Sequence, residues 1–270
     1  MSLTLLKLGG ELLETAPRLS AMGRTIARAG GRLVVVHGGG REIDVALLAA
    51  GIPKRQVDGL RVTDAPTLEI VVGVLAGAVN TRLVAAVNAA RGKAVGLTGA
   101  DAGVTPVRKA PAHRATTGEL VDLGLVGEPV RAASPALVTT LTGRGFVPVI
   151  ACIGAAKDGQ LYNVNADTLA GSLAARLGVG RLIIAGGTAG VLDEQGRTIP
   201  SLGRADIRAL VASGTASAGM VAKLRAAESA ARAGVAHVAI IDGRDPKAIG
   251  RALDARGLDG VPPGSTRVTS

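Results

Sequence analysis

The chain has 270 residues, of which 47% are hydrophobic and 1% aromatic, and its formal net charge is +10. This length and apolar content allow a substantial core and exclude a disordered or fibrous chain. The basic residues are scattered singly, and Phe146 and Tyr162 are the only aromatic residues, so neither a basic stripe nor a stacking platform for a nucleic acid is expected. We interpret the charge as a solvated surface that attracts anionic small molecules.

The single cysteine, Cys152, excludes an internal disulfide and suits a reducing compartment. The start, MSLTLLKLGG, has no basic segment ahead of a long apolar one. No stretch reaches about 18 uninterrupted residues of membrane character. These patterns predict a cytoplasmic protein that has no membrane span.

Apolar runs alternate along the chain with alanine-rich helical segments. Strands are predicted over 4–8, 32–38, 94–99, 146–154, 181–187 and 237–243. Helices are predicted over 20–30, 41–51, 67–91, 134–145, 166–178 and 221–234, with a hairpin excursion over 104–133. Strands that feed glycine loops and then helices predict an α/β fold, an open αβα sandwich with a mainly parallel central sheet. Ligands of such sheets bind at the carboxyl ends of the strands.

Glycine-rich loops follow several of these strands. VVVHGGGREID (34–44) and KLGGE (7–11) place free backbone N–H groups beside a helix N-terminus, where an anion is favoured. Any one such loop could equally be a tight turn, but GLTGADAG (96–103), GGTAG (186–190) and SGTASAGMVAK (213–223) repeat the pattern. Together they favour a phosphate-bearing ligand.

Several common sites are absent from the sequence. It contains neither the phosphate loop GxxxxGK[ST] nor the dinucleotide fingerprint GxGxxG with a following acidic residue. No Ser/His/Asp set assembles, and we interpret His37 as a structural residue at a strand end. The three histidines and the cysteine lack zinc spacing, so no metal site is predicted.

Five segments, taken in order, resemble the amino acid kinase family, and within it the N-acetylglutamate kinases. They are KLGGE (7–11), VVVHGGG (34–40), DGLRVTD (58–64), GQLYNVNADTLAG (159–171) and GMVAKLRAAESA (219–230). The resemblance runs from about residue 4 to residue 244 and implies the carbamate kinase-like fold. It also implies transfer of the ATP γ-phosphoryl group to the side-chain carboxylate of N-acetyl-L-glutamate, the second step of arginine biosynthesis.

The resemblance assigns stabilisation of the transferring phosphoryl group to two lysines. Lys7 and Lys223 would stabilise the transition state from the two sides of the phosphoryl group, and Asp167 would orient both lysines. Because the substrate carboxylate is already ionised at pH 7, this chemistry needs no general base. A solvated surface lysine is the alternative, but Lys7 ends an apolar strand, where an unpaired ammonium is costly. Asp167 also stands where a helix N-cap is expected.

The remaining site residues follow from the same resemblance. Gly39 and Gly40 would offer backbone donors to the acyl substrate, Arg61 would hold its α-carboxylate with a guanidinium fork, and Asn163 would bind the same ligand. ATP would lie over the second half of the chain, with Mg²⁺ held mainly by its phosphates. The residues implied for nucleotide binding are Gly10, Gly187, Thr188, Gly190, Thr215, Gly219 and Met220. The implied division is a lobe over 1–175 for N-acetylglutamate binding and dimerisation and a lobe over 176–270 for ATP, on one continuous sheet.

The sequence departs from the family pattern at three places. Gly186 and Gly187 stand where Ser/Thr-Asp is usual, so a carboxylate expected near the nucleotide is missing, while Ala100 replaces a common lysine and Asp58 a usual asparagine. The chain also begins almost at its first strand, whereas arginine-inhibited hexameric members carry an additional N-terminal helix, so we expect a homodimer without strong arginine feedback.

Two other functions remain open from the sequence. One is a kinase that acts on α-aminoadipate or glutamate linked to a carrier protein, for which a basic surface would suit an acidic partner. The other is a ligand sensor that keeps the fold without ATP turnover, suggested only by Gly186 and Gly187. The presence of Lys7, Asp167 and Lys223 argues against the sensor.

Overall fold

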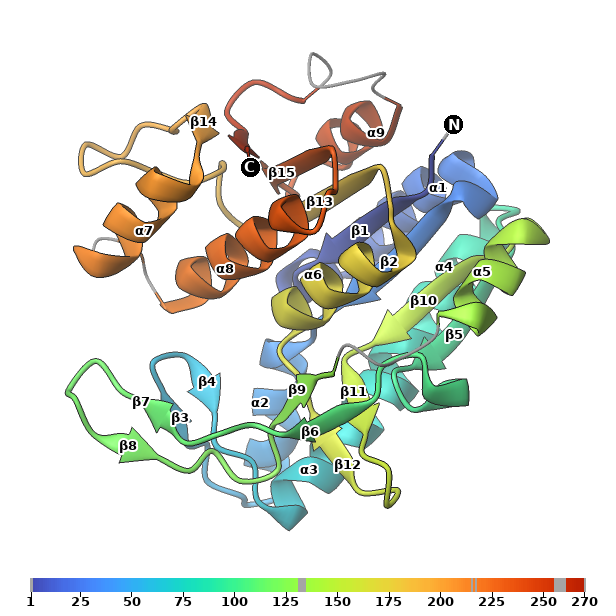
Figure 1. Cartoon of the computed structure of the whole chain (residues 1–270). Helices are drawn as coiled ribbons and strands as arrows, with labels where there is room; N and C mark the ends of the chain where they lie inside the picture. The colour runs from blue at the N-terminus through green and yellow to red at the C-terminus, as the bar shows by residue number, and fades with distance from the viewer. Residues whose placement is uncertain (1, 131–134, 215, 217, 255–260, 270) are drawn as a thin grey trace.

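Six apolar runs form the centre of one eight-stranded sheet in the computed structural model of the chain (Figure 1). They are β1 (Thr4–Leu8), β2 (Leu33–His37), β5 (Ala94–Thr98), β10 (Val147–Ala151), β13 (Arg181–Gly186) and β15 (His237–Asp242). Every pairing among these six strands is parallel. The structure describes residues 2–130, 135–214, 216, 218–254 and 261–269. The six strands and the fold class predicted from the sequence are therefore confirmed.

Two further strands extend the sheet at one edge. β16 (Thr266–Val268) pairs with β15 in the antiparallel direction, and β14 (Ser201–Leu202) pairs in parallel with β16. The order across the sheet is β14-β16-β15-β13-β1-β2-β10-β5. β1 therefore lies in the middle of the sheet, and its carboxyl end opens between those of β2 and β13.

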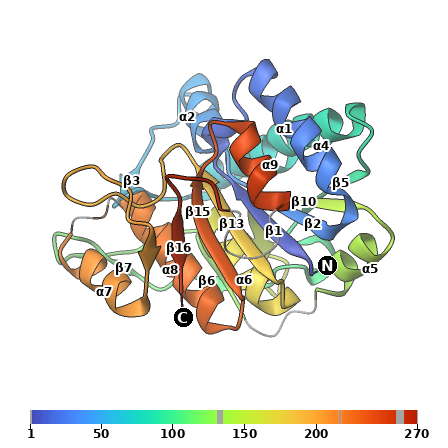
Figure 2. The same cartoon turned by 90° about the horizontal axis from the view of Figure 1, so that it is seen from above.

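Helices cover both faces of the sheet (Figure 2). α1 (Ala16–Ala29), α4 (Asn80–Ala89) and α9 (Pro246–Asp254) lie on one face, and α6 (Ala166–Leu177) and α8 (Ala218–Arg232) lie on the other. The remaining helices are α2 (Gly40–Ala49), α3 (Ala65–Val72), α5 (Ala136–Gly143) and α7 (Arg204–Ala212), with short 3₁₀ turns at Gly10–Leu12, Gly30–Arg32 and Asp101–Gly103. The six predicted helices are present, and α7 and α9 were not predicted.

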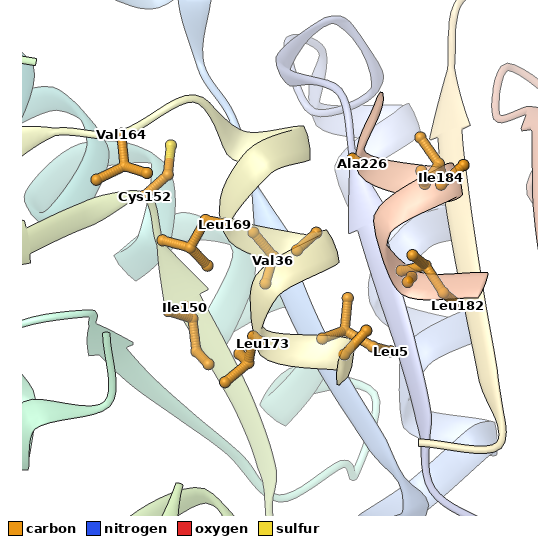
Figure 3. Close-up of a cluster of buried hydrophobic side chains, with 14 of the residues drawn as sticks. Leu5, Val36, Ile150, Cys152, Val164, Leu169, Leu173, Leu182, Ile184 and Ala226 are labelled. Carbon is orange, nitrogen blue, oxygen red and sulfur yellow. The ribbon is translucent and has the colours of Figure 1, made fainter. Parts of the chain in front are cut away.

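The core follows the alternation of side chains along each strand. Leu5 of β1 and Val36 of β2 point towards α6 and α8, where they pack with Leu169 and Leu173 (Figure 3). Leu6 and Leu8 belong to the opposite face and pack with the α1, α4 and α9 layer. On β1 the next position that faces α6 after Leu5 is Lys7, so the sequence places a charged residue at an inward position where the strand ends.

Four small hairpins lie beyond the carboxyl ends of the strands (Figure 1). They are β3 (Gln56–Val57) with β4 (Leu60–Arg61), β6 (Val107–Lys109) with β9 (Gly127–Pro129), β7 (His113–Arg114) with β8 (Leu120–Val121), and β11 (Ile153–Ala155) with β12 (Leu161–Asn163). The predicted excursion over 104–133 is thus a pair of hairpins, although 131–133 lie outside the described residues. Asp58 joins two hairpins, because its carboxylate accepts hydrogen bonds from His113 Nε2 at 2.8 Å and from Thr116 N at 2.9 Å.

A continuous helix runs from Ala65 to Ala89 through α3, a π-helical segment over Gly73–Val79, and α4. By length and composition this helix could cross a membrane, and 33% of its most apolar window is buried. Glu69 and Arg82 interrupt it, however, so it contains no uninterrupted apolar run of about 18 residues, as expected from the sequence. The helix lies against α1 and β5 in the fold, and no membrane is needed to explain its buried positions.

The π-helical segment positions the glycine loop that follows β2. Asn80, the first residue after that segment, donates from Nδ2 to Val149 O at 2.9 Å and to Nε2 of the fully buried His37 at 3.1 Å. His37 Nδ1 lies 3.1 Å from Gly38 O, which fits a neutral ring with its proton on Nδ1. Burial lowers the pKa of His37 to about 4, so the ring is neutral at pH 7. This arrangement agrees with the structural role predicted for His37.

We predict that His37 weakens the fold in acid. Between pH 6.5 and 4 the unfolded chain binds a proton at His37 that the folded chain does not, so the free energy of unfolding falls as the pH drops through this window. The loss reaches about 3 kcal/mol at pH 4 by linkage. Urea titrations at pH 7, 5.5 and 4.5 should show a shallower pH dependence for His37→Gln than for the wild type. Equal pH dependences would contradict this origin.

Candidate active site

A cavity of about 250 Å³ opens where β1 and β2 end. Residues from both glycine loops, from the β3–β4 hairpin, from the start of α6 and from α8 line it. Among the residues predicted for the site, the cavity brings together Lys7, Gly10, Gly39, Gly40, Arg61, Asn163, Asp167 and Lys223. The parallel strands explain this convergence, because their carboxyl ends meet at the same edge of the sheet.

Asp167 lies between the two lysines of the cavity. Its Oδ1 is 2.8 Å from Lys7 Nζ, and its Oδ2 is 3.9 Å from Lys223 Nζ. The side chains of Lys7, Lys223 and Asp167 are only 6%, 18% and 8% exposed. One carboxylate therefore serves a buried and a partly buried ammonium group, and the cluster retains a net positive charge that faces the cavity.

Asn165, rather than Asp167, caps α6. The Asn165 side chain accepts hydrogen bonds from the N–H groups of Asp167 at 2.9 Å and Thr168 at 3.0 Å. The N-cap role expected for Asp167 was therefore wrong. The cap satisfies the first turn, so the Asp167 carboxylate is left to face Lys7. Sequence reasoning missed Asn165, although an asparagine just before a helix is a recognisable N-cap signal.

Burial sets the electrostatics of the remaining ionisable groups. Burial lowers the pKa of Lys223, while the charge of Asp167 opposes that shift, Lys7 adds to it and Glu11 opposes it. Cys152 also lines the cavity, and burial raises its pKa to about 12. Its thiol is thus protonated at pH 7 and is a poor nucleophile.

The two glycine loops contact each other through their backbones. A Cβ on Gly10 would lie 2.7 Å from Gly39 Cα, and a Cβ on Gly39 would lie 2.8 Å from Leu75 Cδ2 of the π-helical segment. Both distances are shorter than real Cβ contacts, so a side chain at Gly10 requires movement of the backbone, and one at Gly39 requires the Leu75 side chain to move. Glycine is needed here to bring the two loops together as well as to expose N–H groups.

Arg61 is fixed at the other end of the cavity. Its Nη2 donates to Asp44 Oδ1 at 2.5 Å and to Gly40 O at 3.2 Å. Burial alone would raise the pKa of Asp44, but hydrogen bonds from Lys54 and Arg61 outweigh burial and lower it. Arg61 Nη1 is buried and has no hydrogen-bond partner among the described residues. Its hydrogen-bonding capacity is therefore unused within the described residues.

Asn163 lies near Arg61 on the hairpin side of the cavity. Its Nδ2 donates to Thr63 Oγ1 at 3.2 Å, and its backbone N–H donates to Leu125 O at 3.0 Å. Both contacts hold the amide in place while it lines the cavity.

The residues predicted for nucleotide binding do not line this cavity, apart from Gly10. Gly187 borders it, since a Cβ there would lie 3.5 Å from the Glu11 carboxylate. Gly219 O accepts from Lys223 Nζ at 3.4 Å. Gly190 has a φ of 60°, and a Cβ there would lie 2.6 Å from Thr266 Oγ1, so glycine is required for packing.

The other three residues predicted for nucleotide binding are Thr188, Met220 and Thr215. Thr188 Oγ1 lies 3.5 Å from Gly190 O. Met220 packs against the core, and Thr215 lies outside the described residues. Within the described part of the chain, no group of three or more His, Cys, Asp or Glu side chains could hold a metal ion.

Known proteins resemble this chain in sequence along most of its length. The acetylglutamate kinase of Acidiphilium cryptum is 42% identical over 249 residues, which cover 90% of this chain and 83% of that protein. The acetylglutamate kinase of Bordetella avium is 47% identical over 214 residues, which cover 79% and 71% of the two chains.

Solved structures share the fold at lower identity. An N-acetylglutamate synthase from Neisseria gonorrhoeae superposes with a TM-score of 0.80 at 21% identity, covering all of this chain but 59% of the longer synthase. A carbamate kinase from Giardia superposes with a TM-score of 0.67 at 16% identity, covering 99% and 98% of the two chains. The model of one family matches residues 2–242, and this chain therefore belongs to the amino acid kinase family.

Proposed function

We propose that this chain transfers the γ-phosphoryl group of ATP to the side-chain carboxylate of N-acetyl-L-glutamate, the second step of arginine biosynthesis. The products are N-acetyl-L-glutamyl 5-phosphate and ADP. The observation that carries the proposal is the buried cluster of Lys7, Asp167 and Lys223 beside two glycine loops. The relatives that are 42% and 47% identical are named acetylglutamate kinases, which supports this choice of acceptor.

The chemistry requires two anions to be held against each other. A carboxylate oxygen of the acceptor forms a bond to the γ-phosphorus while the bond to the bridging β,γ-oxygen breaks, and ADP leaves with that electron pair. The acceptor is ionised at pH 7, so no proton has to be removed. Lys7 and Lys223 stabilise the charge on the transferring oxygens, and Asp167 holds the two lysines together.

The acyl substrate lies at the end of the cavity that holds Arg61. The Nη1 group of Arg61 donates to the substrate α-carboxylate, and the Asn163 amide binds the same ligand. Gly39 and Gly40 direct backbone donors to the acceptor carboxylate and the migrating group. The Asp44 carboxylate keeps the Arg61 guanidinium in place through Nη2.

The nucleotide lies over the second half of the chain. We place its phosphates between Gly10 and Lys223 and the rest of ATP along Gly187, Thr188, Gly190, Gly219 and Met220, with Thr215 as a further contact. The glycines leave room for a polyphosphate beside Lys223. Mg²⁺ held mainly by the ATP phosphates would screen their charge.

The two lobes of the chain follow from this placement. Residues 1–175 supply the acyl end of the site and residues 176–270 the nucleotide end. They share one sheet, because β13 pairs directly with β1. Cytoplasmic location stays a prediction.

We predict that turnover depends on Lys223. Hydroxylamine trapping with MgATP should give a hydroxamate with N-acetylglutamate but not with glutamate, aspartate or N-acetyl-α-aminoadipate. Lys223→Ala should lower kcat by about 10²–10³-fold, the usual cost of a lost transition-state donor. Lys157→Ala, which removes an exposed lysine, is the matched control and should leave kcat unchanged.

The same assay separates the alternatives. Binding of ATP without turnover of any of the four acceptors would favour a carrier-protein-linked substrate. Failure to bind ATP would favour a ligand sensor and would overturn the kinase assignment.

We predict that Arg61 controls affinity for the acyl substrate. Arg61→Lys keeps the charge but loses the planar fork, so KM for N-acetylglutamate should rise by about 10–100-fold, as expected for lost charge-assisted hydrogen bonds. The KM for MgATP should change less than about twofold, because Arg61 lies at the other end of the cavity. Steady-state kinetics with each substrate varied in turn measures both values. A matching rise in both would contradict the assignment.

We propose a homodimer in which a second copy covers the 65–89 helix and the edge strand β5. This helix is strongly apolar, yet only 33% of its most apolar window is buried within one chain. β5 is an edge strand of the described sheet. A cavity of about 280 Å³ lies between the helix and the strand, and its lining contains Ala76, Val84 and Leu97 together with the polar residues Asn80, Thr81, Thr98 and Asp101.

We predict that a charge in this surface weakens the dimer. Sedimentation velocity should give twice the mass of one chain for the wild type. Val84→Glu should shift the equilibrium towards the monomer, since an unpaired carboxylate in an apolar interface is costly. Leu192→Glu, at an exposed position in the second half of the chain, is the control and should remain dimeric. A monomeric or hexameric wild type would contradict the proposal.

A further inference from the structure

Glu11 places an acidic side chain at the nucleotide end of the cavity. It lies in the 3₁₀ turn Gly10–Leu12, directly after the first glycine loop, and it lines the cavity with Lys223. Its carboxylate lies so close to Gly9 that a Cβ at that position would collide with it. Because Gly9 has no side chain, the Glu11 carboxylate can occupy the space beside it.

The same carboxylate lies beside Gly186 and Gly187 at the end of β13. The point where a Gly187 Cβ would stand is 3.5 Å from Glu11 Oε1. The corresponding point on Gly186 is 3.6 Å from Glu11 Oε1 and 3.2 Å from Lys223 Cε. Glu11 thus lies across from Lys223 in the region where we place the phosphates of ATP.

The Glu11 side chain has no hydrogen bond or ion pair within the described ranges, although its charge is felt at Lys223. Asp167 already neutralises part of the lysine pair at 2.8 Å and 3.9 Å. The structure therefore gives Glu11 no fixed partner of its own. The cations that line the cavity, Lys7 and Lys223, are held by a different carboxylate.

An isolated carboxylate is unfavourable beside a polyphosphate. Two like charges at contact repel each other. A divalent cation between the two anions reverses the sign of the interaction. Mg²⁺ takes oxygen ligands and is commonly held by one or two carboxylates together with substrate phosphates.

We propose that Glu11 is a ligand of the divalent cation carried by the nucleotide, contributed directly or through a cation-bound water. This inference rests on the proposed function, because it requires a polyphosphate at Gly186 and Gly187. It extends the expectation that the phosphates alone hold Mg²⁺. Glu11 would thus supply a carboxylate beside the end of β13, where Gly186 and Gly187 have no side chains.

The geometry offers a second way to place a carboxylate there. The Cβ direction of Gly187 is free except for Glu11 itself, whose Cγ and Oε1 are both 3.5 Å away. An aspartate at 187 therefore points into the space that Glu11 now occupies. A carboxylate moved from position 11 to position 187 should restore the function of Glu11 if that function is to hold a cation.

Isothermal titration calorimetry with ADP tests the proposal without turnover. ADP is titrated in excess MgCl₂ and in EDTA into the wild type, Glu11→Gln, Glu11→Ala/Gly187→Asp and Glu69→Gln. Glu69 is an exposed acidic residue of α3 outside the cavity, so Glu69→Gln is the matched control for the loss of one negative charge.

The measured quantity is the ratio of the ADP affinity in MgCl₂ to the ADP affinity in EDTA. Mg²⁺ should strengthen ADP binding to the wild type, and Glu11→Gln should reduce that enhancement roughly tenfold, a typical cost of removing a supporting metal contact. Binding of metal-free ADP should stay within about twofold or tighten, because a repulsive charge has been removed. The double variant should recover most of the enhancement, and Glu69→Gln should match the wild type.

Other outcomes overturn the proposal. An unchanged enhancement in Glu11→Gln, or an equal loss of affinity with and without Mg²⁺, would assign Glu11 to charge balance or packing. A wild type that binds no nucleotide would overturn this inference together with the proposed function. A wild type that shows the Mg²⁺ effect but yields no hydroxamate from N-acetylglutamate would overturn only the choice of acyl substrate.

Discussion

The fold around the cavity depends on one buried carboxylate that serves two lysines. Lys7 occupies an inward position at the end of the central strand, where a hydrophobic residue would otherwise continue the core. Burial of an ammonium group there costs several kcal/mol unless it is paired. The Asp167 carboxylate of α6 is that partner, 2.8 Å from Lys7 Nζ. It also lies 3.9 Å from Nζ of Lys223, which belongs to α8. Removal of Asp167 would leave two buried positive charges facing each other.

Three separate elements must be positioned for this pairing to exist. β1 fixes Lys7, the Asn165 cap begins α6 so that Asp167 faces β1, and α8 packs on α6 and carries Lys223. Gly171 makes the last contact possible, because a Cβ there would lie 2.8 Å from Ala226 O. The charge cluster of the site therefore depends on the packing of the core. A shift of either α6 or α8 would separate Asp167 from a lysine.

Sequence patterns predicted the parts of this structure that repeat a strong local signal. The six central strands are apolar runs that end in glycine, and all were found. β14 and β16 were missed because each has two or three residues, and their pairing depends on long-range contacts, of β16 with β15 and of β14 with β16, rather than on local preference. The π-helical segment was also invisible, because its sequence, GVLAGAV, has the composition of an ordinary apolar helix.

The site shows the same division between local and long-range information. The family motifs identified eight of the residues that line the cavity, including Lys7, Asp167 and Lys223, and glycines at strand ends are typical of an anion site. They could not identify Glu11, because an acidic residue in a turn is usually solvated, and its place is defined by Gly186 and Gly187 about 175 residues away. The Asn165 cap was missed for a simpler reason, because Asp167 stands two residues later and is an equally good N-cap residue.

The charges of the cavity differ between its two ends, and this difference matches the two substrates. Arg61, held by Asp44, offers a fixed guanidinium that recognises a bare carboxylate without any metal. At the other end Glu11 lies beside Lys223, so the wall contains both signs of charge. A free polyphosphate is repelled by one of these groups, whereas a polyphosphate that carries a cation is attracted by both. Under the proposed role of Glu11, the site selects the metal-bound nucleotide at one end, and under the proposed role of Arg61 it binds a carboxylate without a metal at the other.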